Sequence, residues 1–192
     1  MGLFSSASKP PAMAQMPTCQ ARLFQKETEE MSQITRVANQ VTTETFNALN
    51  SARALGKNKS LSSDQRAQVS NAKELLELQG TFAKYTTQEL TCFNKTYDQW
   101  GNELAQKYER QGGDSRALLN DSNLRTKDGY SPDSLRNEVV RHRGFVTKMA
   151  SDGMQDVVNA VQTLNNIAAA KGAPRVPDVS ATWAKAANPA SW

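Results

Sequence analysis

Three long stretches in which apolar side chains recur every three or four residues constrain the fold of this chain most. That spacing places the side chains on one face of an α-helix. The stretches cover about residues 18–55, 62–111 and 131–171. The apolar–polar alternation of a half-buried β-strand does not persist for a strand's length anywhere in the sequence. The sequence therefore predicts an all-α protein with three long helices.

Local signals mark where these helices begin and end. Thr18 is a candidate N-cap for the first helix, and Ser62 with Gln65 three residues later has the pattern of a capping box. Ser131 followed by Pro132 is typical of an N-cap with proline at the first helical position. Helices commonly stop at glycine, which adopts the left-handed conformation without strain. The glycines at the predicted helix ends are Gly56, Gly112, Gly113 and Gly172.

The apolar seams repeat with the 3.5-residue period of helices that pack side by side. A short loop over residues 56–61 makes the first two helices antiparallel neighbours. Only 38% of the residues are hydrophobic and the seams are rich in alanine, so they predict an elongated antiparallel three-helix bundle, a coiled-coil rod, and not a thick core. Gly101 lies inside the second helix and allows a break there. The seams consist of Phe24, Met31, Ile34, Ala38, Val41, Ala48, Ala52 and Leu55; Val69, Ala72, Leu76, Ala83, Leu90, Phe93, Tyr97, Trp100 and Leu104; and Leu135, Val139, His142, Val146, Met149, Val157, Ala160, Leu164 and Ile167.

The two ends of the chain are predicted to be extended arms, over residues 1–17 and 172–192, with one or two helical turns allowed over residues 179–187 of the second. Both segments are rich in proline and small residues, yet each contains isolated large apolar side chains. Tryptophan is costly to leave in water and is enriched at binding hot spots. We therefore expect these side chains to dock on another subunit, with packing of the tryptophans on the protein's own bundle as the alternative. The predicted docking residues are Leu3, Phe4, Trp183 and Trp192.

The charge distribution indicates at most a weak contact with nucleic acid. The formal net charge is +4, and both signs are interspersed along the chain. A dedicated nucleic-acid-binding protein gathers its basic residues on one face. The third helix carries the one basic cluster, which we interpret as a solvated face or as a set of phosphate contacts to DNA. Its members are Arg136, Arg141, Arg143 and Lys148.

Few residues have the side chains that catalysis or metal binding needs. His142 is the only histidine, and its place on a seam favours a core or interface role over catalysis with Glu138 as an orienting carboxylate. Folding the first helix back on the second brings Cys19 near Cys92, so these two form either a disulfide or two unpaired thiols. The sequence predicts no cofactor and no metal. It also lacks the roughly 18 consecutive apolar residues of a membrane span.

These features favour a non-enzymatic structural subunit of a large assembly that binds other protein subunits, including copies of itself. Within that class we expect a virion component, such as an internal, connector or ejection protein of a tailed phage. One alternative is a soluble helical adaptor or secretion-system subunit in the cytoplasm. Another is a myristoylated peripheral membrane protein, because Gly2 and Ser6 fit the acylation pattern.

Overall fold

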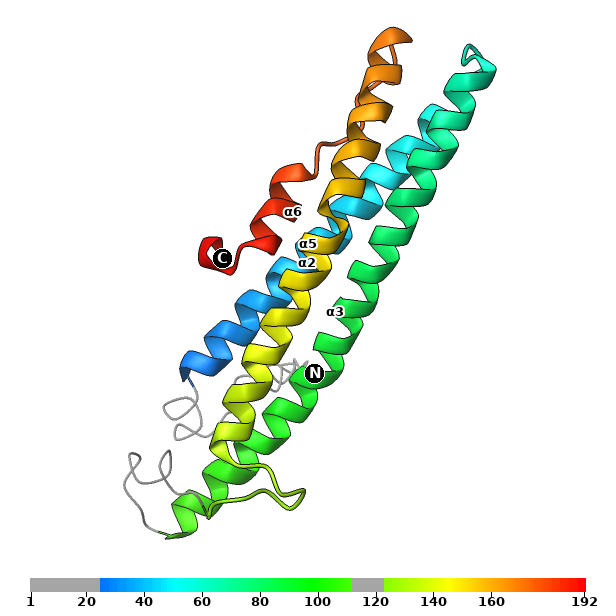
Figure 1. Cartoon of the computed structure of the whole chain (residues 1–192). Helices are drawn as coiled ribbons and strands as arrows, with labels where there is room; N and C mark the ends of the chain where they lie inside the picture. The colour runs from blue at the N-terminus through cyan, green and yellow to red at the C-terminus, as the bar shows by residue number, and fades with distance from the viewer. Residues whose placement is uncertain (1–24, 112–122) are drawn as a thin grey trace, which may run out of the picture.

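The computed structural model describes residues 25–111 and 123–192, and within these ranges every regular element is a helix. The predicted all-α class is therefore confirmed for this part of the chain. Figure 1 shows the three long helices lying side by side, with a short helix against the flank of the bundle. The elements are α2 (Gln25–Gly56), α3 (Ser63–Gln111), α5 (Pro132–Ala170), α6 (Ser180–Ala187) and the short 3-10 helix η2 (Pro189–Ser191).

Two of the predicted capping motifs are present at the starts of α3 and α5. The backbone N–H of Gln65 donates to the Ser62 hydroxyl at 3.2 Å, and the Ser62 N–H donates to the Gln65 side chain at 3.0 Å. Ser131 and Ser134 exchange the same pair of bonds at the start of α5. Gly172 follows α5 with a φ of 61°, a left-handed conformation that glycine adopts without strain. Both capping predictions and the predicted stop at Gly172 are confirmed.

Helix α3 is continuous over 49 residues, which corresponds to a length of about 73 Å. The break that glycine allows at Gly101 does not occur. A second glycine, Gly80, lies where α3 runs close to α2. A Cβ added there would lie 3.4 Å from the Thr45 methyl carbon and 3.5 Å from the Phe46 ring. The absence of a side chain at Gly80 therefore accompanies a close approach of α3 to α2.

The predicted seams form the core. Of the seam residues that the structure describes, all are buried except Met149, which is partly buried. One polar layer interrupts the core at mid-height. Thr45 donates its hydroxyl hydrogen to the carbonyl of Val41 at 2.7 Å and accepts from the indole N–H of Trp183 at 2.9 Å. The side-chain amide of Gln79 donates to Asp156 at 2.9 Å, so this layer joins α2, α3, α5 and α6.

Gly153 is the point at which α5 comes closest to its neighbours. A Cβ added at Gly153 would lie 2.4 Å from Oε1 of Gln79 and 2.7 Å from Cζ3 of Trp183. Both distances are shorter than non-bonded carbon contacts allow. The absence of a side chain at residue 153 therefore makes room for Trp183 and for the Gln79 amide at the same level of the bundle.

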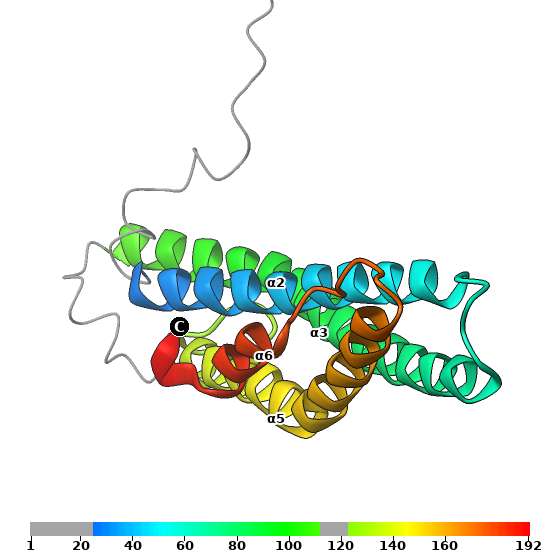
Figure 2. The ribbon, with the colours of Figure 1, turned by 90° about the horizontal axis from the view of Figure 1, so that it is seen from above.

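The C-terminal segment contains α6 where one or two helical turns were allowed, but it packs on the bundle and does not extend away as an arm over residues 172–192. Figure 2 shows it turning back from the end of α5 and running along the bundle as α6 and η2. The Asn165 side chain bonds both backbone groups of Val176, at 2.8 and 3.0 Å, and so fixes the returning segment on α5. Four side chains of this segment, spaced three, four and three residues apart, are buried against the bundle: Val176, Val179, Trp183 and Ala186. Their burial favours a docked segment over an arm in solvent. The expected N-terminal arm over residues 1–17 and the start of the first helix lie outside the described residues.

Candidate functional site

The predicted docking residues at the C-terminus pack on the protein's own bundle. Trp183 is fully buried, which corrects the expectation that it docks on another subunit. Its large ring fills the space beside Gly153, and the Thr45 hydroxyl satisfies its indole N–H. Trp192 is partly buried, and its indole N–H donates to the Lys185 carbonyl at 2.8 Å. Leu3 and Phe4 lie outside the described residues, so their docking stays a prediction.

Two members of the predicted basic cluster hold α5 against α2. Arg136 pairs with Glu27 at 3.2 Å, and Arg143 pairs with Glu30 at 2.7 Å. Both carboxylates belong to the first turns of α2, far from the arginines in the sequence. These side chains therefore act as ties between two helices, and their positive charges are balanced within the bundle.

The other two members form ion pairs along α5 itself. Arg141 pairs with Glu138 at 2.6 Å, and its guanidinium carbon lies 5.0 Å from the centroid of the Phe145 ring. Lys148 pairs with Asp152 at 2.7 Å. All four basic residues of the cluster thus have an acidic partner, which weakens the case for phosphate contacts to DNA. That contact stays a prediction.

His142 is a core residue in the described structure. Its ring stacks on Phe93 with centroids 3.9 Å apart, and Phe145 meets it edge-on at 5.8 Å. Its Nδ1 lies 2.7 Å from the backbone carbonyl of Glu138. A carbonyl oxygen only accepts hydrogen bonds, so Nδ1 carries the proton of the neutral ring. The other nitrogen, Nε2, is buried and has no partner within the described part of the chain.

The surroundings of His142 favour its neutral form. Burial lowers the pKa of the imidazole below its usual 6.5, because the charged ring is poorly solvated inside the bundle. The positive charge of Arg141 lowers this pKa further, while the Glu138 carbonyl and the acidic side chains of Glu138 and Glu89 oppose the shift. His142 is therefore uncharged at neutral pH, as expected for a packing residue.

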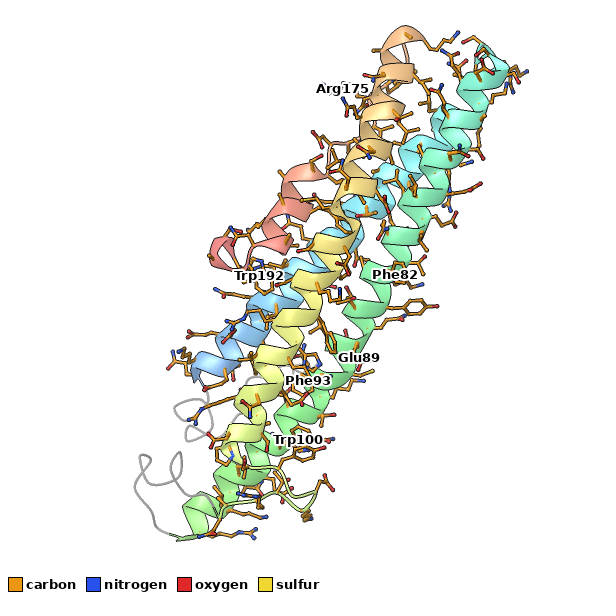
Figure 3. All side chains as sticks on the ribbon, viewed as in Figure 1. Phe82, Glu89, Phe93, Trp100, Arg175 and Trp192 are labelled. Atoms are coloured by element: carbon orange, nitrogen blue, oxygen red, sulfur yellow. The ribbon has the colours of Figure 1, made fainter. Side chains whose placement is uncertain are left out.

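An apolar groove lies between α3 and α5. It has a volume of about 610 Å³, and residues of both helices line it. Phe82 and Tyr85 come from α3 and Phe145 from α5, and these three rings are 51%, 63% and 44% exposed. Figure 3 shows Phe82 and Glu89 along α3 at the level where the groove lies. The remaining lining residues are Gln79, Thr86, Leu90, Arg141, His142, Lys148, Met149 and Asp152.

A stripe of exposed apolar side chains on α3 borders this groove. Leu78, Phe82 and Tyr85 are spaced four and three residues apart, so they lie on one face of the helix. Leu78 is 49% exposed, similar to the two rings. We call these three residues the α3 stripe. Helix faces in contact with water normally carry charged and polar residues, so the stripe marks α3 as a surface suited to binding.

Sequence reasoning did not find the groove or the α3 stripe. The signal was present as a second set of apolar residues at helical spacing beside the buried seam of α3. What the spacing alone does not show is which of two adjacent apolar faces is covered by the rest of the chain. Only the placement of α5 and α6 shows that the α3 stripe stays uncovered within the described structure.

The remaining predicted site residues add no chemistry to the groove. Cys92 is exposed on α3, and Cys19 lies outside the described residues, so the proposed pairing stays a prediction. Residues 25–111 and 123–192 contain no group of three or more histidine, cysteine, aspartate or glutamate side chains suited to hold a metal ion. Among the helices in these ranges, none combines the length and apolar character that a membrane crossing requires.

Comparisons with protein-family models, with curated proteins and with solved structures find no match for this chain. The groove and the α3 stripe expose aromatic rings, with charged side chains at the edges of the groove.

Proposed function

We propose that this protein is a non-enzymatic structural subunit of a larger protein assembly, and that it binds a neighbouring subunit through the groove between α3 and α5. The observation that supports this proposal is the α3 stripe, whose apolar side chains flank an apolar groove on the same face. A chain that acts alone in water gains nothing from exposing such a face, whereas a subunit covers it on assembly.

The apolar area is large enough to contribute to a specific contact. Aromatic side chains bury about 150–250 Å² each, so three rings that are half exposed and one leucine leave about 300–400 Å² to be covered. At about 25 cal/mol per Å², covering that area gives roughly 8–10 kcal/mol before the costs of association. Those costs are about 4–15 kcal/mol, so this contact alone is weak and an assembly would combine it with others.

The proposed assembly is a virion, with the chain as an internal, connector or ejection protein of a tailed phage. The chain would act there as an elongated antiparallel three-helix rod that presents its exposed face to neighbouring subunits. Three long helices lying side by side support this proposal, as does a sequence rich in glutamine, asparagine, threonine and alanine. A virion location is proposed on the same grounds.

The test measures assembly in the native source. Wild-type protein, a Phe82→Ser/Tyr85→Ser variant and a Val140→Ser variant would be produced there with the same tag, and particles would be separated on a density gradient. Val140 is the matched control because it is 53% exposed on α5 but does not line the groove. We expect wild type and Val140→Ser to co-sediment with particles and the double variant to remain at the top of the gradient.

Two outcomes would contradict the proposal. In the first, wild-type protein never co-sediments with a particle. In the second, the double variant co-sediments as well as wild type, which would show that the groove plays no part. Co-purification with a membrane complex instead of particles would favour the adaptor or secretion-system alternative.

A further inference from the structure

We propose that the groove between α3 and α5 is occupied by a second copy of this chain, in a two-fold dimer in which α3 of each copy lies over α5 of the other. The two-fold axis runs parallel to the long helices. This inference rests on the proposed function, and it specifies the partner at that same surface. The argument uses the shape of the exposed face, its charges and its area.

The shape of the face is self-complementary. A two-fold interface brings the same surface of both copies together, so that face must carry both a protrusion and a hollow that receives it. The α3 stripe is the protrusion, since its side chains have the four-and-three spacing with which a helix fits a groove. The groove beside it is the hollow, and its wall includes Phe145 and Met149 of α5. One copy therefore offers both parts that its partner needs.

The charges at the two edges of the groove select the orientation. The α3 edge carries Glu89, which is exposed and has no ion pair within the described part of the chain. The α5 edge carries Arg141 and Lys148, whose ion pairs with Glu138 and Asp152 along α5 would be shared with the partner copy. Glu89 and Arg141 line the same groove, beside His142, and so lie at a similar height along the bundle.

An axis parallel to the helices keeps these heights and exchanges the two edges. Glu89 of each copy then faces Arg141 of the other, and opposite charges meet twice in the dimer. An axis perpendicular to the helices would instead place α3 on α3. That arrangement places Glu89 against α3 of the other copy and away from its Arg141 and Lys148. Complementary charges favour the first arrangement because they steer association and fix the register of an interface.

The area of the face predicts a weak dimer. Stable interfaces bury about 800 Å² on each partner, and the apolar part of this face is roughly half of that. We therefore expect a dissociation constant of about 1–100 μM, which lies in the range of weak specific complexes. Such a dimer would form readily at the high local concentration inside an assembly.

The experiment is sedimentation equilibrium of the full chain over a range of concentrations. Wild type and Val140→Ser should shift from monomer to dimer across the micromolar range. Phe82→Ser, Glu89→Arg and Arg141→Glu should each weaken dimerisation at least tenfold. Circular dichroism at 222 nm verifies that each variant keeps its helix content. Because Arg141→Glu also places a carboxylate next to Glu138, Arg141→Gln, which removes the charge and adds no carboxylate, serves as a second variant on the α5 edge.

Mixing the charge variants makes the test specific. In a mixture of Glu89→Arg with Arg141→Glu, both contacts of the proposed heterodimer pair opposite charges, whereas each variant alone pairs like charges. We therefore expect the equimolar mixture to dimerise at least tenfold more strongly than either variant alone. A charge contact confined to one copy predicts no such recovery.

A wild-type chain that stays monomeric up to millimolar concentration would overturn this inference, and so would a mixture that dimerises no better than its components. These results are distinguishable from failure of the proposed function. If wild type is monomeric but Phe82→Ser/Tyr85→Ser still loses particle association, the groove binds a different subunit, and only the present inference fails. If that double variant keeps its particle association, the proposed function fails as well.

Discussion

Replacing Gly153 by alanine tests the packing at the centre of the bundle. A Cβ at this position would lie 2.4 Å from Oε1 of Gln79 and 2.7 Å from Cζ3 of Trp183. The Gln79 amide is held by its bond to Asp156, and Trp183 is fully buried with its indole N–H on Thr45. Neither neighbour is free to move aside, so the added methyl group must displace one of them.

The expected magnitude combines three terms. Inserting a methyl group into a well-packed core costs about 1–3 kcal/mol. Loss of the Gln79 bond to the Asp156 carboxylate adds about 1.5 kcal/mol, while the higher helix propensity of alanine returns about 1 kcal/mol. Gly153→Ala should therefore lower the free energy of unfolding by about 1.5–3.5 kcal/mol. For a chain of this size, that corresponds to a drop in Tm of roughly 3–14 °C.

Gly144 provides the matched control in the same helix. A Cβ added there would meet no atom within 4 Å, so only the propensity term remains. Gly144→Ala should raise the free energy of unfolding by about 1 kcal/mol. Urea unfolding followed by circular dichroism measures both variants, and tryptophan fluorescence in a Trp100→Phe/Trp192→Phe background reports the displacement of Trp183. Equal effects of the same sign at the two positions would refute the packing argument.

Three further predictions concern buried polar groups. Burial lowers the pKa of His142 in the folded state, so below about pH 6.5 the unfolded chain binds a proton that the folded chain does not. The free energy of unfolding should therefore fall as the pH drops below about 6.5. His142→Leu should reduce the difference between the urea midpoints measured at about pH 7.5 and 5.5. Burial raises the pKa of Tyr97 to about 12. Between pH 10 and 12 the unfolded chain loses the Tyr97 proton that the folded chain keeps, so the free energy of unfolding should decline over that range. Tyr97→Phe should remove the step at the highest pH in the tyrosine absorbance titration. Thr45→Val leaves the buried indole N–H of Trp183 without its acceptor and should lower the free energy of unfolding in urea by about 1–3 kcal/mol. Thr81→Val is the control, because it removes an exposed hydroxyl that bonds only to its own helix, and it should have little effect.

The sequence was sufficient for features that depend on neighbouring residues. The capping motifs at Ser62 and Ser131 and the stop at Gly172 are local, because each depends on side chains within one helical turn. The buried seams also followed from spacing, since the same periodicity recurs over many turns and every turn adds evidence. Gly101 shows the limit of local propensity, because packing along both sides of α3 keeps that helix continuous.

Features that depend on distant residues were not predictable in the same way. The C-terminal segment was expected to extend because it contains three prolines, and proline suppresses long helices. Its folding back depends on the Asn165 side chain, which bonds Val176, and on the space left beside Gly153 for Trp183. A sequence shows these residues but not that they meet. The same limit applies to the groove, which exists only where α3 and α5 lie side by side.

The way α6 docks also shows how this bundle accepts an additional helix. On the α2 side of α5, the chain places one large anchor, Trp183, in a space bounded by Gly153 and completes it with a hydrogen bond to Thr45. On the α3 side, the groove is lined by rings and methionine, with charges only at its edges. That face lacks an internal anchor of the kind that α6 supplies to the other. Since Phe82 and Tyr85 form part of the wall of this groove, side chains that fill it come from a partner, and the α3 stripe of a second copy is a segment that carries such side chains.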